Sequence, residues 1–444
     1  MRGCQAAGLV STATAIPRPR RFMVVVGGLT AVNLAINALA LVTGPLQARL
    51  LGPQGRGELA LVLVVTGFAP VVGLSLGAFL AREITRTRER GVLLGTVVVL
   101  SAGLGAFGSV CAYPVSRLFG HGDVQTLIFA GLLTLPVGVV GLNLHGAYWG
   151  EERWKLHSAM RLISPLVIVC GYVVLALLDA FTVVTAAVTV FAASALTMLP
   201  LWPLVRSTRS WGFDRDVARR ALSFGAKVNV GGIASQGNVR VDQIFVASLI
   251  STRELGFYVV AATLATATLL VSQALNQIVV PMVATGDQRF VPRILRITLA
   301  LMIIVAVTLA AATTPLIHVL FGPEYDASVR PAQILCFASV FIAGKGIATA
   351  ALLGHGRPGE TAIIEITTFA TLVGTMLLVV PAYGATGAAV VVMFTAAAGL
   401  GVLVLRTRRW LGGGLAEYLV PTADDLRWLT LAIGNGPSSD EQAG

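Results

Sequence analysis

The stretch FMVVVGGLTAVNLAINALALVT, residues 22–43, decides the class of fold. It carries no charged side chain, and as an α-helix it would reach about 33 Å, enough to cross a hydrocarbon core of about 30 Å. Similar apolar runs recur along all 444 residues, of which 56% are hydrophobic and only 12% charged. A soluble domain could not cover so much apolar surface, so the sequence predicts a protein that crosses a membrane many times.

Twelve such runs predict an all-α polytopic membrane protein, because a backbone in lipid must satisfy its hydrogen bonds within each segment. No cleavage site of small residues follows the first run, which therefore indicates a membrane span and not a signal peptide. The predicted spans are 22–43, 59–80, 92–113, 124–146, 156–178, 182–205, 221–250, 257–284, 297–319, 331–353, 361–381 and 387–405.

Basic residues predict the orientation in the membrane. If the N-terminus is cytoplasmic, 23 of the 32 Lys and Arg residues fall in cytoplasmic segments and five fall outside, namely Arg49, Arg56, Arg117, Arg253 and Arg330. The positive-inside rule then predicts a multi-pass cell (inner) membrane protein with both termini in the cytoplasm. The same rule accounts for the formal charge of +11, and no basic stretch is interleaved with aromatics, so we expect no nucleic-acid partner.

The chain repeats itself at an offset near 200 residues. LLGPQGRG at 50–57 matches LISTRELG at 249–256, and LFG recurs at 118–120 and 320–322. Six spans per repeat insert both halves the same way up and place a cavity at their interface. The predicted organisation is a cytoplasmic N-tail 1–21, a six-helix lobe 22–205, a basic linker 206–220, a six-helix lobe 221–405 and a cytoplasmic C-tail 406–444.

Span seven is unusually polar. Its polar residues form two neighbouring stripes along the helix, Asn229, Gln236, Arg240 and Gln243 on one, and Ser235, Asn238 and Asp242 on the other. A charge that faces lipid at mid-membrane costs about 2.5–3.5 kcal/mol, so these stripes must face protein or water. Two compatible interpretations stay open, which are a cavity wall and an Arg240–Asp242 pair that braces the external end of the helix.

Other spans carry polar residues that allow the same two interpretations. Lys345 lies in the middle of span ten, where it either faces a cavity or is paired. Short polar stripes in spans one and eight either line the cavity or join helices by hydrogen bonds. The candidate cavity residues are Arg240, Lys345, Asn33, Asn37, Asn229, Gln236, Asn238, Asp242, Gln273, Asn276, Gln277 and Arg49.

The sequence predicts no enzyme, no cofactor and no metal site. The strings GLSLG at 73–77 and GLGAFG at 103–108 match a nucleophile motif and a dinucleotide motif, but both lie inside predicted spans, where small residues let helices pack closely. The four cysteines form no C-x-x-C pair, and the five histidines form no cluster with ligand spacing.

Three turns carry a family resemblance. LLGPQGRGELAL at 50–61, RELGFY at 253–258 and LFGPEY at 320–325 resemble turns of the Wzx-type polysaccharide flippases, members of the multidrug/oligosaccharidyl-lipid/polysaccharide (MOP) superfamily. The resemblance implies two six-helix lobes in a V, as in the MATE transporters, with a central cavity lined mainly by spans one, two, seven and eight. The two additional C-terminal helices usual in lipid II flippases of the superfamily are not found after residue 405.

The resemblance also implies a function. The cargo would be an undecaprenyl-diphosphate-linked oligosaccharide for cell-surface polysaccharide, moved by alternating access, with H⁺ or Na⁺ as a coupling ion. Membrane lipid, and polysaccharide polymerase or glycosyltransferase machinery, would be its partners. The alternative is a cation-coupled drug or metabolite antiporter of the same superfamily, which would need buried acids, and only Asp242 and Glu365 qualify.

Overall fold

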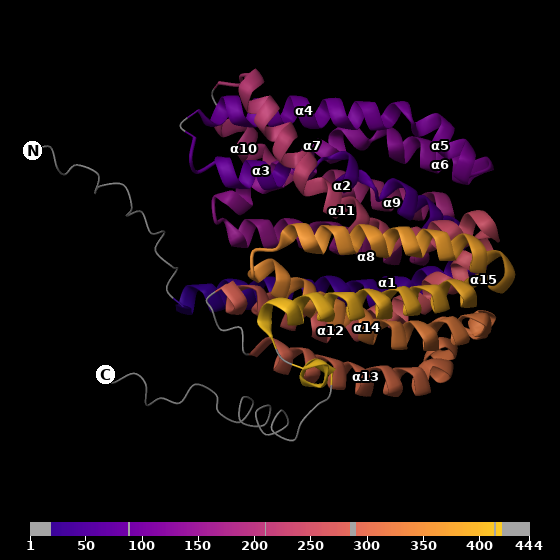
Figure 1. The fold of residues 1–444 in the computed structure, drawn as a ribbon. Helices are drawn as coiled ribbons and strands as arrows, with labels where there is room; N and C mark the ends of the chain where they lie inside the picture. The colour runs from indigo at the N-terminus through magenta and orange to yellow at the C-terminus, as the bar shows by residue number, and fades with distance from the viewer. Residues whose placement is uncertain (1–18, 88, 209, 285–289, 413, 420–444) are drawn as a thin grey trace, which may run out of the picture.

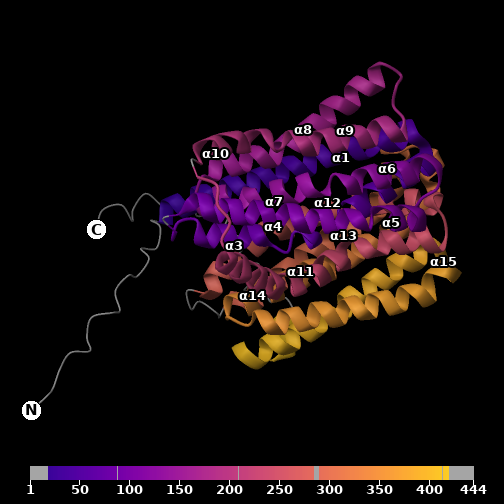
Figure 2. The ribbon, with the colours of Figure 1, turned by 90° about the horizontal axis from the view of Figure 1, so that it is seen from above.

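The computed structural model describes residues 19–87, 89–208, 210–284, 290–412 and 414–419. Within these ranges the chain forms helices and no strand, so the all-α prediction is confirmed. The long helices run side by side along one direction in both views (Figure 1, Figure 2). The start of α1 and the end of α15 lie at the same, left-hand end of Figure 1.

The first half of the chain begins with one long helix and continues with helices that are mostly short and meet at breaks. These are α1 (Pro19–Thr66), α2 (Ala69–Val72), α3 (Leu76–Glu83), α4 (Arg90–Val110), α5 (Ala112–Phe119), α6 (Gly122–Leu133), α7 (Leu135–Gly150), α8 (Trp154–Leu177), α9 (Val183–Leu196), the 3₁₀ turn η1 (Leu199–Leu201) and α10 (Trp202–Ser207).

The second half contains longer helices. These are α11 (Arg215–Leu249), α12 (Thr252–Ala284), α13 (Val291–Leu320), the 3₁₀ turn η3 (Pro323–Ser328), α14 (Val329–Gly354), α15 (Pro358–Leu411) and α16 (Leu415–Leu419). Asp214 begins α11 by accepting hydrogen bonds from the amides of Asp216 and Val217, as a helix N-cap does.

Helices α1 and α15 each fold back on themselves at a glycine with positive φ, Gly52 (φ 65°) and Gly384 (φ 59°). In a straight α15, Glu360 and Trp410 would lie roughly 75 Å apart, but Trp410 Nε1 donates a hydrogen bond of 3.1 Å to Glu360 Oε1. Glycine adopts such a backbone conformation at little cost, which is why the turns lie there. Each of the two helices therefore supplies two adjacent arms.

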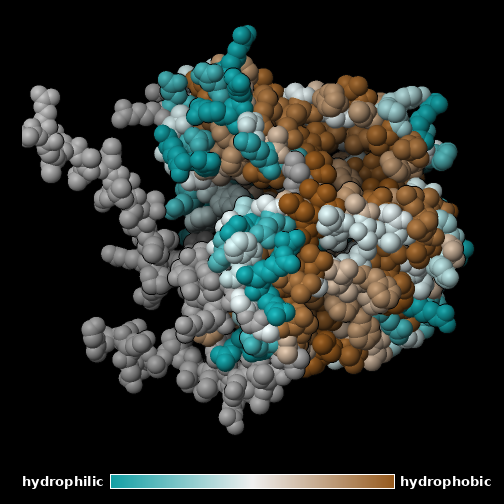
Figure 3. Space-filling view, in the orientation of Figure 1, coloured by the Kyte–Doolittle hydropathy of each residue, from teal (hydrophilic) through white to brown (hydrophobic). Residues whose placement is uncertain are grey.

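Each predicted span falls on helical segments of the structure. Seven described helices are long and apolar enough to cross a membrane, or eight if the bent pair α6 and α7 is one span, by length and composition. Figure 3 shows a brown apolar band over the middle of the surface, with teal hydrophilic residues gathered towards the left and right ends. These features describe an integral membrane protein, while the count of twelve stays a prediction.

Span two was expected to be one continuous helix, and this expectation is wrong. The chain breaks at Leu74 (φ 49°) and Ser75 (φ 52°), between α2 and α3. Asn143 of α7 satisfies the freed backbone, because its Oδ1 accepts from Gly77 N (2.8 Å) and its Nδ2 donates to Gly73 O (3.1 Å). A buried amide thus replaces the missing helical bonds.

The two halves meet along a seam between α1 and α12. A Cβ placed on Gly57 would lie 1.6 Å from Thr252 O, and one placed on Gly256 would lie 2.0 Å from Pro53 O. Each residue is related to its counterpart by 199 positions, so the contact has the two-fold pattern of the sequence repeat. Only glycine permits this approach of the two backbones.

Apolar packing continues across the seam. Leu59 of α1, Leu255 and Tyr258 of α12, and Leu372 of α15 belong to one buried cluster. Of two smaller clusters, one lies in the second half and the other joins the first half to Ala221 of α11. Since lipid tails are as apolar as these side chains, close van der Waals packing holds the halves together, and not exclusion from water.

Candidate functional site

A large hollow with several polar side chains in its wall lies within the second half, between α11, α12, α14 and α15. We call it the C-half cavity, and its volume is about 810 Å³. The polar residues that line it include four of the predicted cavity residues, Asn238, Arg240, Asp242 and Lys345, together with Gln243, Tyr258 and Glu365. The stripes of span seven therefore meet residues of three other helices in one space.

An ion pair lies in this cavity. Lys345 Nζ is 2.9 Å from Glu365 Oε2, and their side chains are 14% and 15% exposed. Asn238 Nδ2 donates to the same carboxylate oxygen at 2.8 Å. The two predicted interpretations of Lys345, that it faces a cavity and that it is paired, both hold in the structure.

The second acid of the cavity is also bonded. The Tyr258 hydroxyl donates to Asp242 Oδ2 at 2.5 Å, and the amide of Gln243 donates to Asp242 Oδ1 at 2.8 Å. Arg240 is exposed towards the cavity and forms no hydrogen bond or ion pair with any described residue. No ion pair or hydrogen bond joins Arg240 to Asp242, although the charge of Arg240 acts on this carboxylate at longer range. Arg240 is thus a cation of this cavity that has no close partner among the described residues and is available to a ligand.

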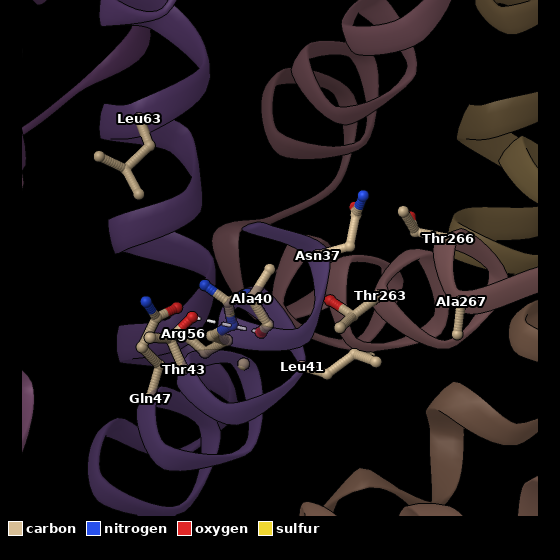
Figure 4. Close-up of a pocket in the computed structure, with 11 residues that line it drawn as sticks. Asn37, Ala40, Leu41, Thr43, Gln47, Arg56, Leu63, Thr263, Thr266 and Ala267 are labelled. Carbon is tan, nitrogen blue, oxygen red and sulfur yellow. Dashed lines mark hydrogen bonds between the residues drawn. The ribbon is translucent and has the colours of Figure 1, made fainter. Parts of the chain in front are cut away.

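A smaller hollow lies in the seam itself. This seam cavity, of about 240 Å³, is lined by both arms of α1 and by α12 (Figure 4). Asn37 and Leu63 would be roughly 39 Å apart in a straight helix, yet both line it, because α1 turns back at Gly52. Thr266 lines both this cavity and the C-half cavity, so the two are neighbours.

Arg56 lies in the seam cavity and is almost completely buried, with 7% of its surface exposed. Its Nε has no hydrogen-bond partner, and no ion pair or hydrogen bond joins the side chain to any described residue. Gln47, 6% exposed, lies beside it. A buried guanidinium without a counter-charge is costly, which makes this residue conspicuous.

Several predicted site residues join helices instead of lining either cavity. Asn33 Oδ1 accepts from Arg161 of α8 at 2.7 Å, and Asn229 Nδ2 donates to Val71 O at 2.8 Å beside the broken span. Arg49 Nε donates to Leu320 O at 2.9 Å, at the end of α13.

The four remaining predicted site residues either lie outside both cavities or have side chains that the structure does not describe. Gln236 is exposed and lines neither hollow. The side chains of Gln273, Asn276 and Gln277 lie outside those that the structure describes.

Sequence reasoning missed Arg56, Gln47 and Tyr258. Arg56 was assigned to an external turn because span two was predicted to begin at residue 59, whereas the helical arm begins directly after Gly52. The stripe of Asn37 continues at Gly44 and Gln47 with helical spacing, and a longer first span would have included both. Tyr258 was noted only as the last residue of the turn RELGFY, and nothing in that turn indicated that it would bond to Asp242.

Among the described residues, no group of three or more His, Cys, Asp or Glu side chains could hold a metal ion. The polar side chains that line the two cavities carry amides, hydroxyls, carboxylates and cationic groups. Such groups can bind a polar or anionic ligand without a covalent step.

Sequence comparisons relate the chain to a polysaccharide biosynthesis family and to membrane proteins of two organisms. A family model described as "Polysaccharide biosynthesis protein" matches residues 46–330. The Shigella flexneri protein named "Putative O-antigen transporter" is 22% identical over 365 residues, which are 77% of this chain and 87% of the relative. A stretch of 90 residues is 34% identical to an uncharacterized membrane protein of Methanocaldococcus jannaschii, 20% of this chain and 18% of that protein.

The fold is similar to solved transporter structures. The lipid II flippase MurJ in an inward closed conformation superimposes with a TM-score of 0.74 at 14% identity, over 92% of this chain and 93% of that one. A MATE multidrug resistance transporter of the MOP superfamily, in an inward-facing conformation, gives a TM-score of 0.65 at 15% identity, over 86% and 94%. The predicted MATE-like fold is thus confirmed.

Proposed function

The chain belongs to the polysaccharide biosynthesis protein family, and from this premise we propose that it is a flippase for an undecaprenyl-diphosphate-linked oligosaccharide. The relative named as an O-antigen transporter supports this proposal, as does the fold shared with a lipid II flippase. The single observation that carries it is a cavity of about 810 Å³ in an apolar helical protein, in which Arg240 has no hydrogen bond or ion pair with any described residue.

The chemistry of the cargo fits this cavity. A diphosphate needs a cation, and the planar guanidinium of Arg240 can donate two parallel hydrogen bonds to it. Sugars need hydrogen-bond donors and acceptors, which Asn238, Gln243 and Thr368 supply. The polyprenyl tail would stay in the surrounding lipid, since the outer surface is apolar.

The ion pair between Lys345 and Glu365 would be the site at which a coupling ion acts during the transport cycle. Lys345 is neutralised by Glu365 and can bind a second anion only after that carboxylate has been neutralised. A proton or a Na⁺ ion at Glu365 would do this, and its departure would restore the pair and release the cargo. We therefore place H⁺ or Na⁺ coupling at Lys345 and Glu365.

Alternating access would occur at the seam. The Gly57–Gly256 contact closes one end, which the charge distribution predicts to be external, and both termini would lie in the cytoplasm at the other end. Opening this contact while α11 stays against α2 and α3 would expose the cavities to the external side. The protein would work in the cell membrane beside glycosyltransferases and a polymerase.

Reconstitution tests this function. Purified protein in liposomes should move a fluorescent undecaprenyl-diphosphate oligosaccharide between leaflets, followed by its loss of access to a membrane-impermeant quencher. The proposal predicts movement that depends on the protein and on the diphosphate. Equal rates in protein-free liposomes, or equal movement of a neutral polyprenyl glycan, would contradict it.

A second candidate follows from Asp242 and Glu365, which lie in the same cavity. A cation-coupled antiporter of drugs or metabolites would use such acids as ion sites. In that case, proteoliposomes with an imposed H⁺ or Na⁺ gradient should export an organic cation. Without such export, the antiporter alternative fails.

A further inference from the structure

We propose that the seam cavity is a second anion site, in which the guanidinium of Arg56 binds a phosphate group. The first observation is the isolation of this charge. Arg56 is 7% exposed and lines the cavity, its Nε is unpartnered, and none of the described residues that line the cavity is acidic. Burial of an ion without a partner costs several kcal/mol, and an anion in the cavity would supply the missing partner.

The neighbours of Arg56 are suited to an anion. Its electrostatic partners are the phenols of Tyr172 and Tyr325, which carry no formal charge at neutral pH. The Tyr325 hydroxyl already donates to Ala48 O at 3.0 Å. Within the described part of the chain, the guanidinium therefore has no counter-charge.

The sequence repeat indicates that the fold itself does not need Arg56 for its stability. The position 199 residues after Arg56 is Leu255, which is fully buried in the apolar cluster. The symmetric contacts of Gly57 and Gly256 show that the two positions are equivalent in space. Because a leucine fills this place in the second half, the fold does not require a charge there.

The size of the cavity defines the ligand. At about 240 Å³ it is smaller than the ~300–1,000 Å³ of pockets that enclose whole drug-sized ligands, so it admits one charged group and not an oligosaccharide. A guanidinium matches the oxygens of a phosphate, which could come from a lipid or from a free anion. If the phosphate is that of a carried lipid, the inference rests on the proposed function.

Calorimetry tests the site without any transport step. The protein carrying Arg240→Gln, which removes the proposed diphosphate donor of the C-half cavity, would serve as the parent, be placed in phosphatidylcholine nanodiscs and be titrated with inorganic pyrophosphate. Loss of charge-assisted hydrogen bonds predicts that Arg56→Leu weakens binding about tenfold to a hundredfold, and that Arg56→Lys weakens it less because the charge remains. Arg253→Leu is the matched control, because Arg253 is exposed and stacks on Phe257 at 5.8 Å in the equivalent turn.

A second nanodisc, which contains phosphatidylglycerol, distinguishes a lipid phosphate from a free anion as the ligand. If phosphatidylglycerol in the disc suppresses pyrophosphate binding to the parent protein, a lipid phosphate occupies the site, and if it does not, the site takes a free anion. Equal binding by the parent and by Arg56→Leu would overturn the proposal. So would a large fall in the melting temperature of Arg56→Leu, because the arginine would then be structural. Both results are independent of whether the protein flips a glycan.

Discussion

A methyl group added at the seam should force the two halves apart. In Gly256→Ala the new Cβ would lie 2.0 Å from Pro53 O, whereas a C–H···O contact needs about 3.3 Å, so the backbones must separate by about 1.3 Å. Overpacking of this kind costs about 1–3 kcal/mol. The ratio of molecules with a closed seam to molecules with an open seam should therefore fall about 5- to 150-fold.

Cross-linking at the seam measures this change. Gln54 Nε2 donates to Thr252 Oγ1 at 2.7 Å across the seam, so cysteines at both positions should react quickly with a short bifunctional thiol reagent. The native cysteines would first be replaced by alanine. Adding Gly256→Ala should slow the cross-link at least fivefold, and Gly57→Ala should slow it more, because its Cβ would lie only 1.6 Å from Thr252 O.

Gly374→Ala in α15 is the control, because a Cβ there would meet nothing within 4 Å, and it should leave the cross-linking rate unchanged. If Gly256→Ala cross-links as fast as its parent while the protein stays monodisperse, the tight glycine contact does not exist and the reasoning is refuted.

Three further predictions follow from the fold and the sequence. Lys345→Met should lower the free energy of unfolding by up to about 3–5 kcal/mol, because it leaves the partly buried carboxylate of Glu365 without its counter-charge. Adding Glu365→Gln should restore most of this loss, and thermal unfolding that shows no recovery would contradict the pair. Asn143→Ala should cost about 1–3 kcal/mol, since two backbone groups of the broken span lose their partner, and an unchanged melting temperature would show that water replaces the amide. Reporter fusions at Gly212 should be cytoplasmic and at Gly120 external, and an inverted result at either would break the predicted order of spans.

Hydropathy predicted the helices well, because an apolar run in lipid has one stable backbone. The same argument failed within span two, where Leu74 and Ser75 leave the helical conformation. That break depends on Asn143 and Asn229, which lie far along the chain and supply the lost hydrogen bonds. A hydropathy profile cannot predict hydrogen bonds between residues that are far apart in the sequence.

The polar stripe of span seven indicated the C-half cavity, because a charged side chain that faces lipid is costly and must therefore face protein or water. Periodicity could place Arg240 and Asn238 on neighbouring stripes, but it could not distinguish a cavity wall from a brace. Asn229 and Asn33, chosen by the same rule, bond to other helices instead. The difference depends on which helix packs opposite, which a single helix does not determine.

Arg56 was counted as a topology signal, since it follows a turn and carries a positive charge. Its burial results from the return of α1 at Gly52 and from the approach of α12, which are tertiary features. The repeat nevertheless contained a clue, because Leu255 at the equivalent position shows that the place is buried.

The central claim is that Arg240 binds the diphosphate of a lipid-linked glycan during transport. Its direct test is the rate of flipping by Arg240→Gln and Arg240→Lys in liposomes, normalised to the amount of inserted protein. The account predicts that Arg240→Gln inserts normally and abolishes flipping, and that Arg240→Lys retains only part of the rate because the charge remains but the two-pronged donor is lost. Flipping at the parental rate by Arg240→Gln, or loss of both variants from the membrane, would contradict the account.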